Sequence, residues 1–385
     1  MRMPFNWAHL FRQAFGSVFG TRNTHRRLTA HRMGALAVFW ILFIPHQIFT
    51  RICLALDNLL FPGWKKVPVE KPLFITGLFR SGTTFLHRLM AGDNENFSAM
   101  KTWEIYLAPS ILQRKILKTW KKLDKLIGSP AMKWLLKYNS RSLGDIQFHQ
   151  VGLWKEEEDE GLLLFLWDSL FTWFFFPDTG GIRDYQFADR EMSRGRQKRK
   201  LSFYKECIRR HLYCHPVSAV YLSKNPAFTP KIASLKEAFP DARIVYMVRN
   251  PAQVLVSQAA WFAFCWNYFA SPAEPYPFRD ELFEMTRHWY SYPLELLKRW
   301  ESSDYLIVEY RNLISRPMDT IDSLYKHFNL KMSGRYRSWL EKESRRTDEY
   351  ASGRRLSLED VGYNSETVQE HFEDIYESFD FSNTD

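Results

Sequence analysis

The side chains best suited to hold an anion follow one another in the run Phe79-Arg80-Ser81-Gly82-Thr83-Thr84. The arginine supplies a permanent positive charge with a forked set of donors, and the hydroxyl residues supply further hydrogen bonds. Apolar residues 73–75 precede this run, and residues 85–89 follow it with a helical pattern. A strand, a small-residue turn and a helix start direct backbone N–H groups and the positive end of the helix dipole to one place. We therefore predict a phosphate or sulfate cradle at residues 79–84.

The glycines of this segment have the spacing of the phosphate loop in ATP-binding enzymes. Gly77 and Gly82 fit the pattern G-x-x-x-x-G-K-[ST], but Thr83 stands where the pattern requires lysine. That lysine reaches the β- and γ-phosphates of a nucleoside triphosphate, so its loss argues against an ordinary ATPase or kinase. The cation stands instead at Arg80, before the second glycine. A phosphotransferase of the P-loop type stays open as an alternative.

Arg249 and Ser257 form a second candidate anion site. Residues 244–248 have the composition of a buried strand, Arg249 ends it, and Asn250-Pro251 predicts a turn and a new helix. Ser257 comes eight residues after Arg249, within that helix. An arginine at a strand end and a serine on the following helix hold a phosphate by charge and by hydrogen bond.

Three further side chains are candidates for chemistry near such a site. Lys224 follows a predicted strand at residues 219–222, and Glu104 follows a short one at residues 97–100. In open α/β sheets, ligands bind beyond the carboxyl ends of the strands. His149 is a second acid–base candidate. A capping or surface role for Glu104 and a structural role for His149 remain the alternatives.

Taken together, these motifs resemble the sulfotransferases that use 3′-phosphoadenosine 5′-phosphosulfate (PAPS). The R-S-G-T-T run resembles their 5′-phosphosulfate loop in the bacterial-type branch, and the pair Arg249 and Ser257 resembles their 3′-phosphate motif. Residues 305–313, 319–330 and 354–360 also resemble family elements, so the likeness extends roughly over residues 71–379. One departure is Asn225, which stands where the family pattern K-[ST]-P has a small hydroxyl residue.

The resemblance implies a PAPS donor, a hydroxylated acceptor and no metal. It assigns the 5′-phosphosulfate to residues 79–84 and the 3′-phosphate to Arg249 and Ser257, with Arg354 and Arg355 as further donor-binding residues. Arg80 and Lys224 would neutralise charge on the leaving phosphate oxygen, since sulfuryl transfer depends mainly on positioning and charge stabilisation. The acceptor proton would pass to Glu104, as in some related enzymes, or to a histidine such as His149.

These elements require an α/β fold. We expect a P-loop-like, three-layer α/β/α arrangement with a central, mostly parallel sheet and helical insertions. Because no internal repeat or linker interrupts the 385 residues, residues 67–385 are predicted to form a single catalytic domain. Residues 1–66 are predicted to be an N-terminal appendage.

The appendage has a composition of its own. Residues 22–32 are basic, and residues 33–45 are almost entirely apolar, which is short for a membrane span and lacks a nearby signal cleavage site. The pattern then becomes amphipathic up to residue 60. Two interpretations are open: a membrane-surface anchor whose basic residues face anionic lipids, or a helix packed on the catalytic domain. The expected location is the cytoplasm, with membrane attachment under the first interpretation.

Composition narrows the partners. A net charge of +10 suits a polyanionic ligand or an anionic membrane. The basic residues 190–210 come without any nucleic-acid-binding motif, so no nucleic acid partner is expected. The four cysteines show no metal-ligand spacing and are expected to be free thiols. The acidic run at residues 156–160 is expected to be solvated at a helix start.

The aromatic segment at residues 261–278 bears on the acceptor. Its composition favours a hydrophobic alcohol, a phenol or a lipid-linked hydroxyl over a soluble sugar. A third functional alternative is a non-catalytic membrane adaptor on the same fold. Such a protein is expected to lose the 3′-phosphate pair, yet Arg249 and Ser257 are both present.

Overall fold

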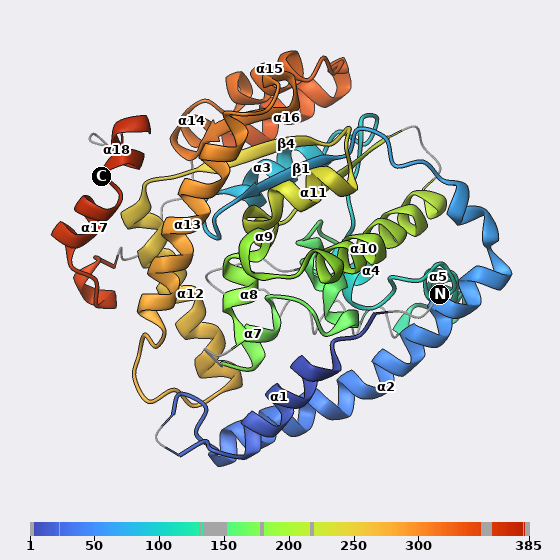
Figure 1. Ribbon diagram of the computed structural model, residues 1–385. Coiled ribbons are helices and arrows are strands. Elements are labelled where there is room, and N and C mark those ends of the chain that lie inside the picture. Colours follow the sequence, from blue (N-terminus) through green and yellow to red (C-terminus); the bar gives the residue numbers. More distant parts are fainter. Residues whose placement is uncertain are drawn as a thin grey trace.

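A parallel sheet of five strands forms the centre of the computed structural model (Figure 1). The structure describes residues 4–22, 24–130, 133, 152–177, 181–215, 219–347, 356–379 and 381, with the side chains of 345–347 left out. The sheet has the order β2-β3-β1-β4-β5, and its strands are β1 (Leu73–Gly77), β2 (Phe97–Ser98), β3 (Val220–Lys224), β4 (Arg243–Val248) and β5 (Tyr305–Glu309). All neighbouring strands are parallel, and Ile75 of β1 lies in register with Lys224 of β3.

Helices cover both faces of this sheet, and the central strand β1 shows why. Leu73 and Ile75 pack into one core cluster with the helices α3 (Thr83–Ala91), α15 (Pro317–His327) and α16 (Gly334–Thr347). Phe74 points to the opposite face and packs with α10 (Arg194–Cys214) and α11 (Ile232–Ala238). Successive side chains of a strand alternate between faces, so an apolar run fills two layers at once. The predicted three-layer α/β/α fold is confirmed.

The turn predicted at Asn250-Pro251 starts a long helix, α12 (Pro251–Phe269). The Asn250 side chain accepts hydrogen bonds from the amides of Ala252 and Gln253, and Pro251 takes the first helical position. It packs against α13 (Arg279–Leu297), α17 (Ser365–His371) and the 3₁₀ turn η6 (Glu359–Val361). Other elements of the C-terminal half are α14 (Tyr310–Ser315), α18 (Glu373–Phe379) and the 3₁₀ turns η4 (Pro226–Lys231) and η5 (Ser302–Asp304).

The segment before α10 consists of short elements: η2 (Asp159–Leu166), α7 (Thr172–Phe175), α8 (Arg183–Gln186) and α9 (Ala188–Glu191). The prediction that the acidic run at residues 156–160 is solvated is wrong, because Glu157, Asp159 and Glu160 are buried. Each meets a buried partner that is distant in the sequence, as the functional site shows.

The N-terminal residues form α1 (Trp7–Val18), α2 (Ala30–Leu60) and the turn η1 (Pro62–Lys66), with α4 (Thr102–Tyr106) and α5 (Ile111–Leu126) nearby. In Figure 1, α1 and α2 run along one edge of the molecule. By length and composition alone, α2 could cross a membrane. Its side chains nevertheless bond to the catalytic part, since Thr50 accepts from Gln113 at 2.8 Å and Asp57 accepts from Ser110 at 2.9 Å.

Candidate functional site

The predicted cradle is present as a tight loop between β1 and α3. Arg80 and Gly82 both have left-handed backbone conformations, with φ of 71° and 89°. A side chain at position 82 would meet the ring of Tyr310, whose nearest carbon lies 2.4 Å from an added Cβ, so only glycine fits. Gly82 is also the N-cap of α3 and has no side chain with which to cap the helix. The first N–H groups of α3 therefore remain available for an anion.

The hydroxyl of Ser81 braces the loop from within. Ser81 is buried, and its Oγ donates to the carbonyl oxygen of Leu78 at 2.7 Å. At the end of β1, the Thr229 hydroxyl accepts a hydrogen bond from the Gly77 amide at 2.9 Å and donates one to the Gly77 carbonyl oxygen at 2.6 Å. These bonds hold the loop in one shape, which is the preorganisation that charge stabilisation requires.

The two predicted anion sites are in direct contact. The guanidinium of Arg249 donates to the carbonyl oxygen of Arg80 at 2.7 Å, although the two residues are 169 positions apart. The side chain of Arg80 reaches the second anion site, where its Nε donates to Ser257 Oγ at 2.9 Å. The Arg249 guanidinium also stacks over Tyr310, 4.3 Å from the ring centre. Arg80, Arg249 and Ser257 thus form a single basic patch at the carboxyl ends of β1 and β4.

Lys224 closes the other side of the cradle. It is fully buried at the end of β3, and its Nζ lies 3.1 Å from Thr84 Oγ1 at the start of α3. Nζ also lies 2.8 Å from Glu157 and 3.0 Å from Glu158. Burial by itself lowers the pKa of Lys224, but the two glutamates outweigh it and leave the pKa above its usual value. The lysine is therefore a fixed positive charge beside the cradle.

Asn225, the departure from the family pattern, serves the buried acids. Its amide nitrogen donates to Asp159 Oδ1 at 3.0 Å, and the hydroxyls of Tyr204 and Tyr221 donate to the other oxygen. Burial raises the pKa of Asp159 to about 6, although these hydrogen bonds favour the charged form. An asparagine amide carries two N–H donors, whereas the hydroxyl of serine or threonine is on a shorter side chain and carries one. The bond to Asp159 therefore gives a structural reason for asparagine at this position.

Glu104 lies in a buried polar group of its own. Its Oε1 is 3.2 Å from the Arg114 guanidinium and 3.0 Å from His215 Nε2, and its Oε2 accepts the Lys101 amide at 3.0 Å. Burial alone raises the pKa of Glu104, but Arg114 and the hydrogen bond from His215 outweigh it, so the pKa lies well below its usual range. These contacts connect Glu104 to α5 and to the end of α10. Its role as the general base remains a prediction.

The same group has the composition of a metal site. One ligand atom each of Glu104, His211 and His215 lie within 4.8 Å of one another. Arg114, however, donates to His211 Nδ1 at 3.1 Å as well as to Glu104. Because arginine only donates, His211 must carry its proton on Nε2, which faces Ser98 Oγ at 2.9 Å. The guanidinium thus already supplies this group with a positive charge. Sequence spacing could not reveal this group, since Glu104 and His215 are 111 residues apart.

A family comparison agrees with this geometry. The sulfotransferase family model matches residues 72–334, which include the cradle, Lys224, Arg249 and Ser257. The chain belongs to the sulfotransferase family. Among curated proteins, no sequence matches it.

Two solved structures resemble this sulfotransferase in fold. Sulfotransferase STF9 from Mycobacterium avium has a TM-score of 0.74 at 16% identity, covering 98% of this chain and 92% of that one. Sulfotransferase STF1 from Mycobacterium tuberculosis has a TM-score of 0.62 at 17% identity, covering 96% of this chain and 99% of that one. At such low identity the likeness concerns the fold alone.

Beside Glu157 of the acidic run, sequence reasoning missed a histidine near the cradle of the sulfotransferase. His87 lies on α3, three positions after Thr84, and is buried beside the Lys224 and Glu157 pair. Burial first, and then the charge of Lys224, lowers the pKa of His87 to about 3, so the imidazole is neutral. The available signal was helical spacing, because residues three apart share one face of a helix.

Three predicted site residues of the sulfotransferase, His149, Arg354 and Arg355, lie outside the described residues.

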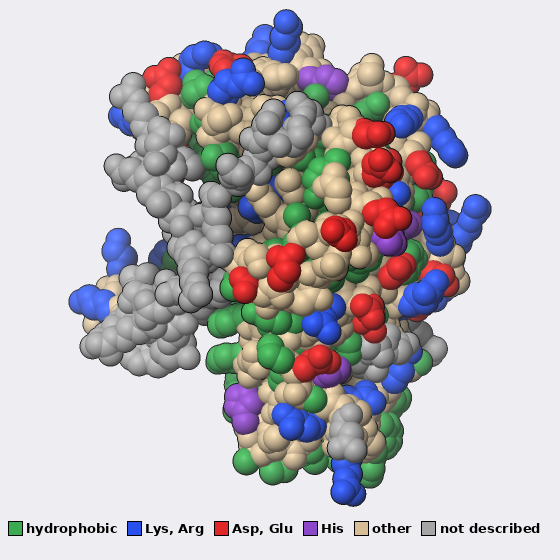
Figure 2. Space-filling view, turned by 90° about the vertical axis from the view of Figure 1, so that its left-hand side faces the viewer, with side chains coloured by type: hydrophobic (Ala, Val, Ile, Leu, Met, Phe, Trp, Pro, Cys, Tyr) green, Lys and Arg blue, Asp and Glu red, His purple; other side chains and the backbone are tan. Residues whose placement is uncertain are grey.

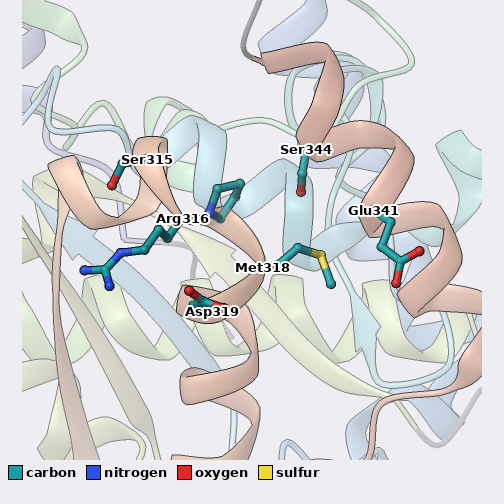
Figure 3. A pocket seen from close by; sticks show the side chains of 7 residues that line it. Ser315, Arg316, Met318, Asp319, Glu341 and Ser344 are labelled. Atoms are coloured by element: carbon teal, nitrogen blue, oxygen red, sulfur yellow. The ribbon is translucent and has the colours of Figure 1, made fainter.

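A separate cavity of about 320 Å³ lies between the α14–α15 junction and α16 (Figure 3). Its lining contains no residue of the cradle and consists of Ser315, Arg316, Pro317, Met318, Asp319, Glu341 and Ser344. The lining holds two carboxylates and one arginine, which does not suit a donor with several negative charges.

Proposed function

We propose that this sulfotransferase transfers a sulfuryl group from PAPS to a hydroxyl group of a hydrophobic or lipid-linked acceptor. The observation that carries the proposal is the convergence of three cationic side chains, Arg80, Arg249 and Lys224, on one strand-to-helix turn. A phosphotransferase that uses magnesium has less support, because Glu157 and Glu158 beside the cradle are bonded to Lys224.

The residues present fit a donor with negative charge at two ends. Arg249 and Ser257 would hold the 3′-phosphate, and the loop at residues 79–84 would hold the 5′-phosphosulfate, with Arg354 and Arg355 still predicted as further contacts. Glycine at position 82 leaves the loop backbone open to close approach. When bound, PAPS supplies an activated sulfuryl group on a phosphate leaving group.

The catalytic task of the chain is then mainly electrostatic. Lys224 and Arg80 would neutralise the negative charge that grows on the leaving phosphate oxygen. Lys224 needs no reorganisation to do so, because Thr84 and two glutamates already fix its ammonium group. Charges fixed in a buried site stabilise a transition state more strongly than mobile ones in water.

For the general base we propose Glu157, in place of Glu104. Glu157 is buried and lies 2.8 Å from the cation beside the cradle, whereas the bonds of Glu104 run to Arg114 and His215. The proton of the acceptor hydroxyl would pass to Glu157 as the new S–O bond forms.

We expect Glu157→Gln to lower turnover by roughly 10²–10⁴-fold, the usual contribution of a general base, with little change in donor affinity. Glu158 remains as the partner of Lys224, so the fold should hold. Initial rates with labelled donor and isothermal calorimetry with adenosine 3′,5′-bisphosphate measure the two quantities.

The matched variant Glu104→Gln should mainly lose stability, by roughly 3–5 kcal/mol, since it leaves Arg114 buried without its counter-ion. The folded-state pKa of Glu104 is depressed, so its contribution is present above the unfolded pKa and lost as pH falls below it. The difference in Tm between Glu104→Gln and wild type should therefore stay constant from pH 7 to about pH 5 and shrink as pH falls further, towards the depressed folded-state pKa. An unchanged Tm with abolished turnover would instead return the base to Glu104.

The proposal of a hydrophobic acceptor rests on aromatic side chains beside the cradle. Phe79, at the start of the loop, contacts Phe174 with ring centres 6.4 Å apart, and Phe174 contacts Trp261 at 6.4 Å. Phe174 and Trp261 are only partly buried. An apolar wall next to the donor loop suits an acceptor with apolar surface. Attachment to the cytoplasmic surface of a membrane remains a prediction.

Incubation with sulfate-labelled PAPS and fractionated extracts tests the activity. We expect label to appear in the lipid-soluble fraction, and the Lys224 and Glu157 variants to abolish it. Transfer confined to soluble sugars would refute the acceptor class. No transfer to any fraction, together with no binding of adenosine 3′,5′-bisphosphate, would refute the sulfotransferase reaction.

A further inference from the structure

The first helix, α1, has its polar face inward. His9, Gln13 and Ser17 are buried, and both His9 and Gln13 lie within hydrogen-bond distance of Thr172 Oγ1, at 3.0 and 3.2 Å. The aromatic side chains of Trp7 and Phe15 are 58% and 61% exposed. A helix on the surface of a water-soluble protein normally has the reverse arrangement.

The second helix, α2, repeats this reversal over a greater length. Its buried residues are largely polar, and Gln47, Thr50 and Asp57 bond to the catalytic part. Its outward residues are large, apolar and about half exposed or more: Met33, Val38, Ile41, Leu42, Ile44, Ile48, Phe49, Ile52, Leu59 and Leu60.

The helix α5 is the third of this kind and adds positive charge. Gln113, Arg114 and Asp124 are buried, whereas Trp120 and Leu123 are 41% and 57% exposed. Its lysines are all exposed, namely Lys115, Lys118, Lys121, Lys122 and Lys125. Apolar side chains with lysines around them are typical of a helix that lies at a membrane interface.

We call these outward faces of α1, α2 and α5 the apolar platform. The three helices are neighbours, since Arg32 of α2 bonds to Ser17 of α1 at 3.3 Å and α2 packs against α5. Figure 2 shows hydrophobic side chains along the lower edge of the molecule, where Figure 1 places α1 and α2. An exposed apolar surface built by three helices far exceeds the scattered apolar residues of ordinary surfaces.

We infer that the apolar platform embeds the protein in one leaflet of a bilayer with anionic headgroups. The helix α2 has 31 residues and so is about 45 Å long, more than a bilayer core of about 30 Å requires. It is bonded to the catalytic part along its length, through Arg32 to the Phe269 carbonyl, Gln47 to the Phe165 carbonyl and Asp57 to Ser110. These bonds hold α2 parallel to the body, so it lies in the membrane plane and does not cross.

The charge that complements anionic lipids comes from α5. The sequence pattern assigned this charge to the basic residues 22–32, but several of these residues hydrogen-bond to the rest of the protein. Arg27 donates to the Pro272 carbonyl at 2.9 Å, His31 lies 2.9 Å from the Tyr268 carbonyl, and Arg32 is buried. Arg27, His31 and Arg32 thus fasten the start of α2 to the end of α12 and the residues after it. The exposed lysines of α5 take over the electrostatic part.

The same lysines decide between a membrane and a second copy of the chain. A two-fold dimer would bring identical faces together and so place the α5 lysines of both copies near one interface. Enclosing charges of one sign in a protein interface is unfavourable, whereas anionic headgroups attract them. A lipid surface also accepts an extended, unindented apolar face, which a protein partner must match in shape.

The test is flotation of the full chain with vesicles of phosphatidylcholine containing some phosphatidylglycerol, at low and at high salt. We expect binding at low salt and a substantial salt-resistant remainder, because apolar burial is not screened. The variant Ile41→Glu/Ile48→Glu/Ile52→Glu replaces side chains that are 69%, 55% and 53% exposed. It should lower the partition coefficient at least roughly 30-fold.

The matched variant Lys118→Gln/Lys121→Gln/Lys122→Gln keeps the apolar face and should lose only the salt-sensitive part. Adenosine 3′,5′-bisphosphate binding, measured without vesicles, should be unchanged in both variants, which separates this inference from the proposed reaction. Complete release of the wild-type chain at high salt would refute embedding. So would unchanged binding of the glutamate variant, or sedimentation as a dimer that ignores vesicles.

Discussion

Replacing Lys224 with methionine should lower the rate of sulfuryl transfer by roughly 10²–10³-fold, the usual effect of removing one fixed charge from a transition state. Methionine has a similar length and no charge, so the shape of the buried site changes little. Donor affinity should fall much less than the rate, because Arg249 and Ser257 still hold the other end of the nucleotide. Single-turnover rates with labelled PAPS and calorimetry with adenosine 3′,5′-bisphosphate separate the two effects.

The control for this experiment is stability, because Lys224→Met leaves the buried Glu157 and the partly buried Glu158 without their cation. Lys200→Met removes another buried lysine, 3.3 Å from Asp168 and outside the cradle. It should destabilise the fold while a preparation that is still folded keeps its turnover. A folded Lys224→Met protein with wild-type turnover would remove Lys224 from the mechanism.

Replacing Arg249 with alanine should erase the preference for a 3′-phosphorylated nucleotide. The wild-type protein should bind adenosine 3′,5′-bisphosphate far more tightly than 5′-AMP, by about 1.5–3 kcal/mol or roughly 10- to 100-fold. The guanidinium is already held by the Arg80 carbonyl and the Tyr310 ring, so little entropy is lost on binding. Calorimetry with both nucleotides measures the preference.

Arg243→Ala is the matched control, because Arg243 begins the same strand that Arg249 follows. Its guanidinium stacks over Phe328 at 5.5 Å, on the opposite end of β4 from the cradle. This variant should retain the full preference for the 3′-phosphate. Equal affinity of the wild-type protein for the two nucleotides would contradict the proposed donor.

The sheet and the cradle could be predicted because their signals are local. The strands at residues 73–77 and 243–248 contain the apolar runs 73–75 and 244–248, and each strand is followed by a turn before a helix. The cradle depends on glycine and hydroxyl residues within a few positions of one another. Such patterns depend on backbone geometry more than on distant partners.

The acidic run at residues 156–160 could not be placed in the same way. Its burial depends on Lys224, which is 67 residues from Glu157, and on Lys231, which is 71 residues from Glu160. A run of carboxylates is usually solvated, because an unpaired buried charge is very costly. Only the tertiary structure brings the compensating lysines to it. For the same reason the sequence could not show that Arg114 occupies the group of Glu104, His211 and His215.

The polar, inward face of α2 could not be predicted from the sequence either. An apolar run next to basic residues fits both an anchor and a packed helix. The structure shows packing through the polar residues and exposure of the apolar ones, so the helix packs on the protein with one side and leaves the other for the membrane contact that we infer.

The position of β1 in the sheet has a consequence for biosynthesis. Its neighbours are β3 and β4, and Thr76 of β1 bonds to Thr229 at 2.6 Å across a separation of 153 residues. At about 5–20 residues per second, the ribosome exposes this apolar strand with both edges unpaired for on the order of ten seconds. Such a delay favours aggregation and engagement by chaperones. Yield in a foreign host should then depend on chaperone supply and translation speed more than on the stability of the finished fold.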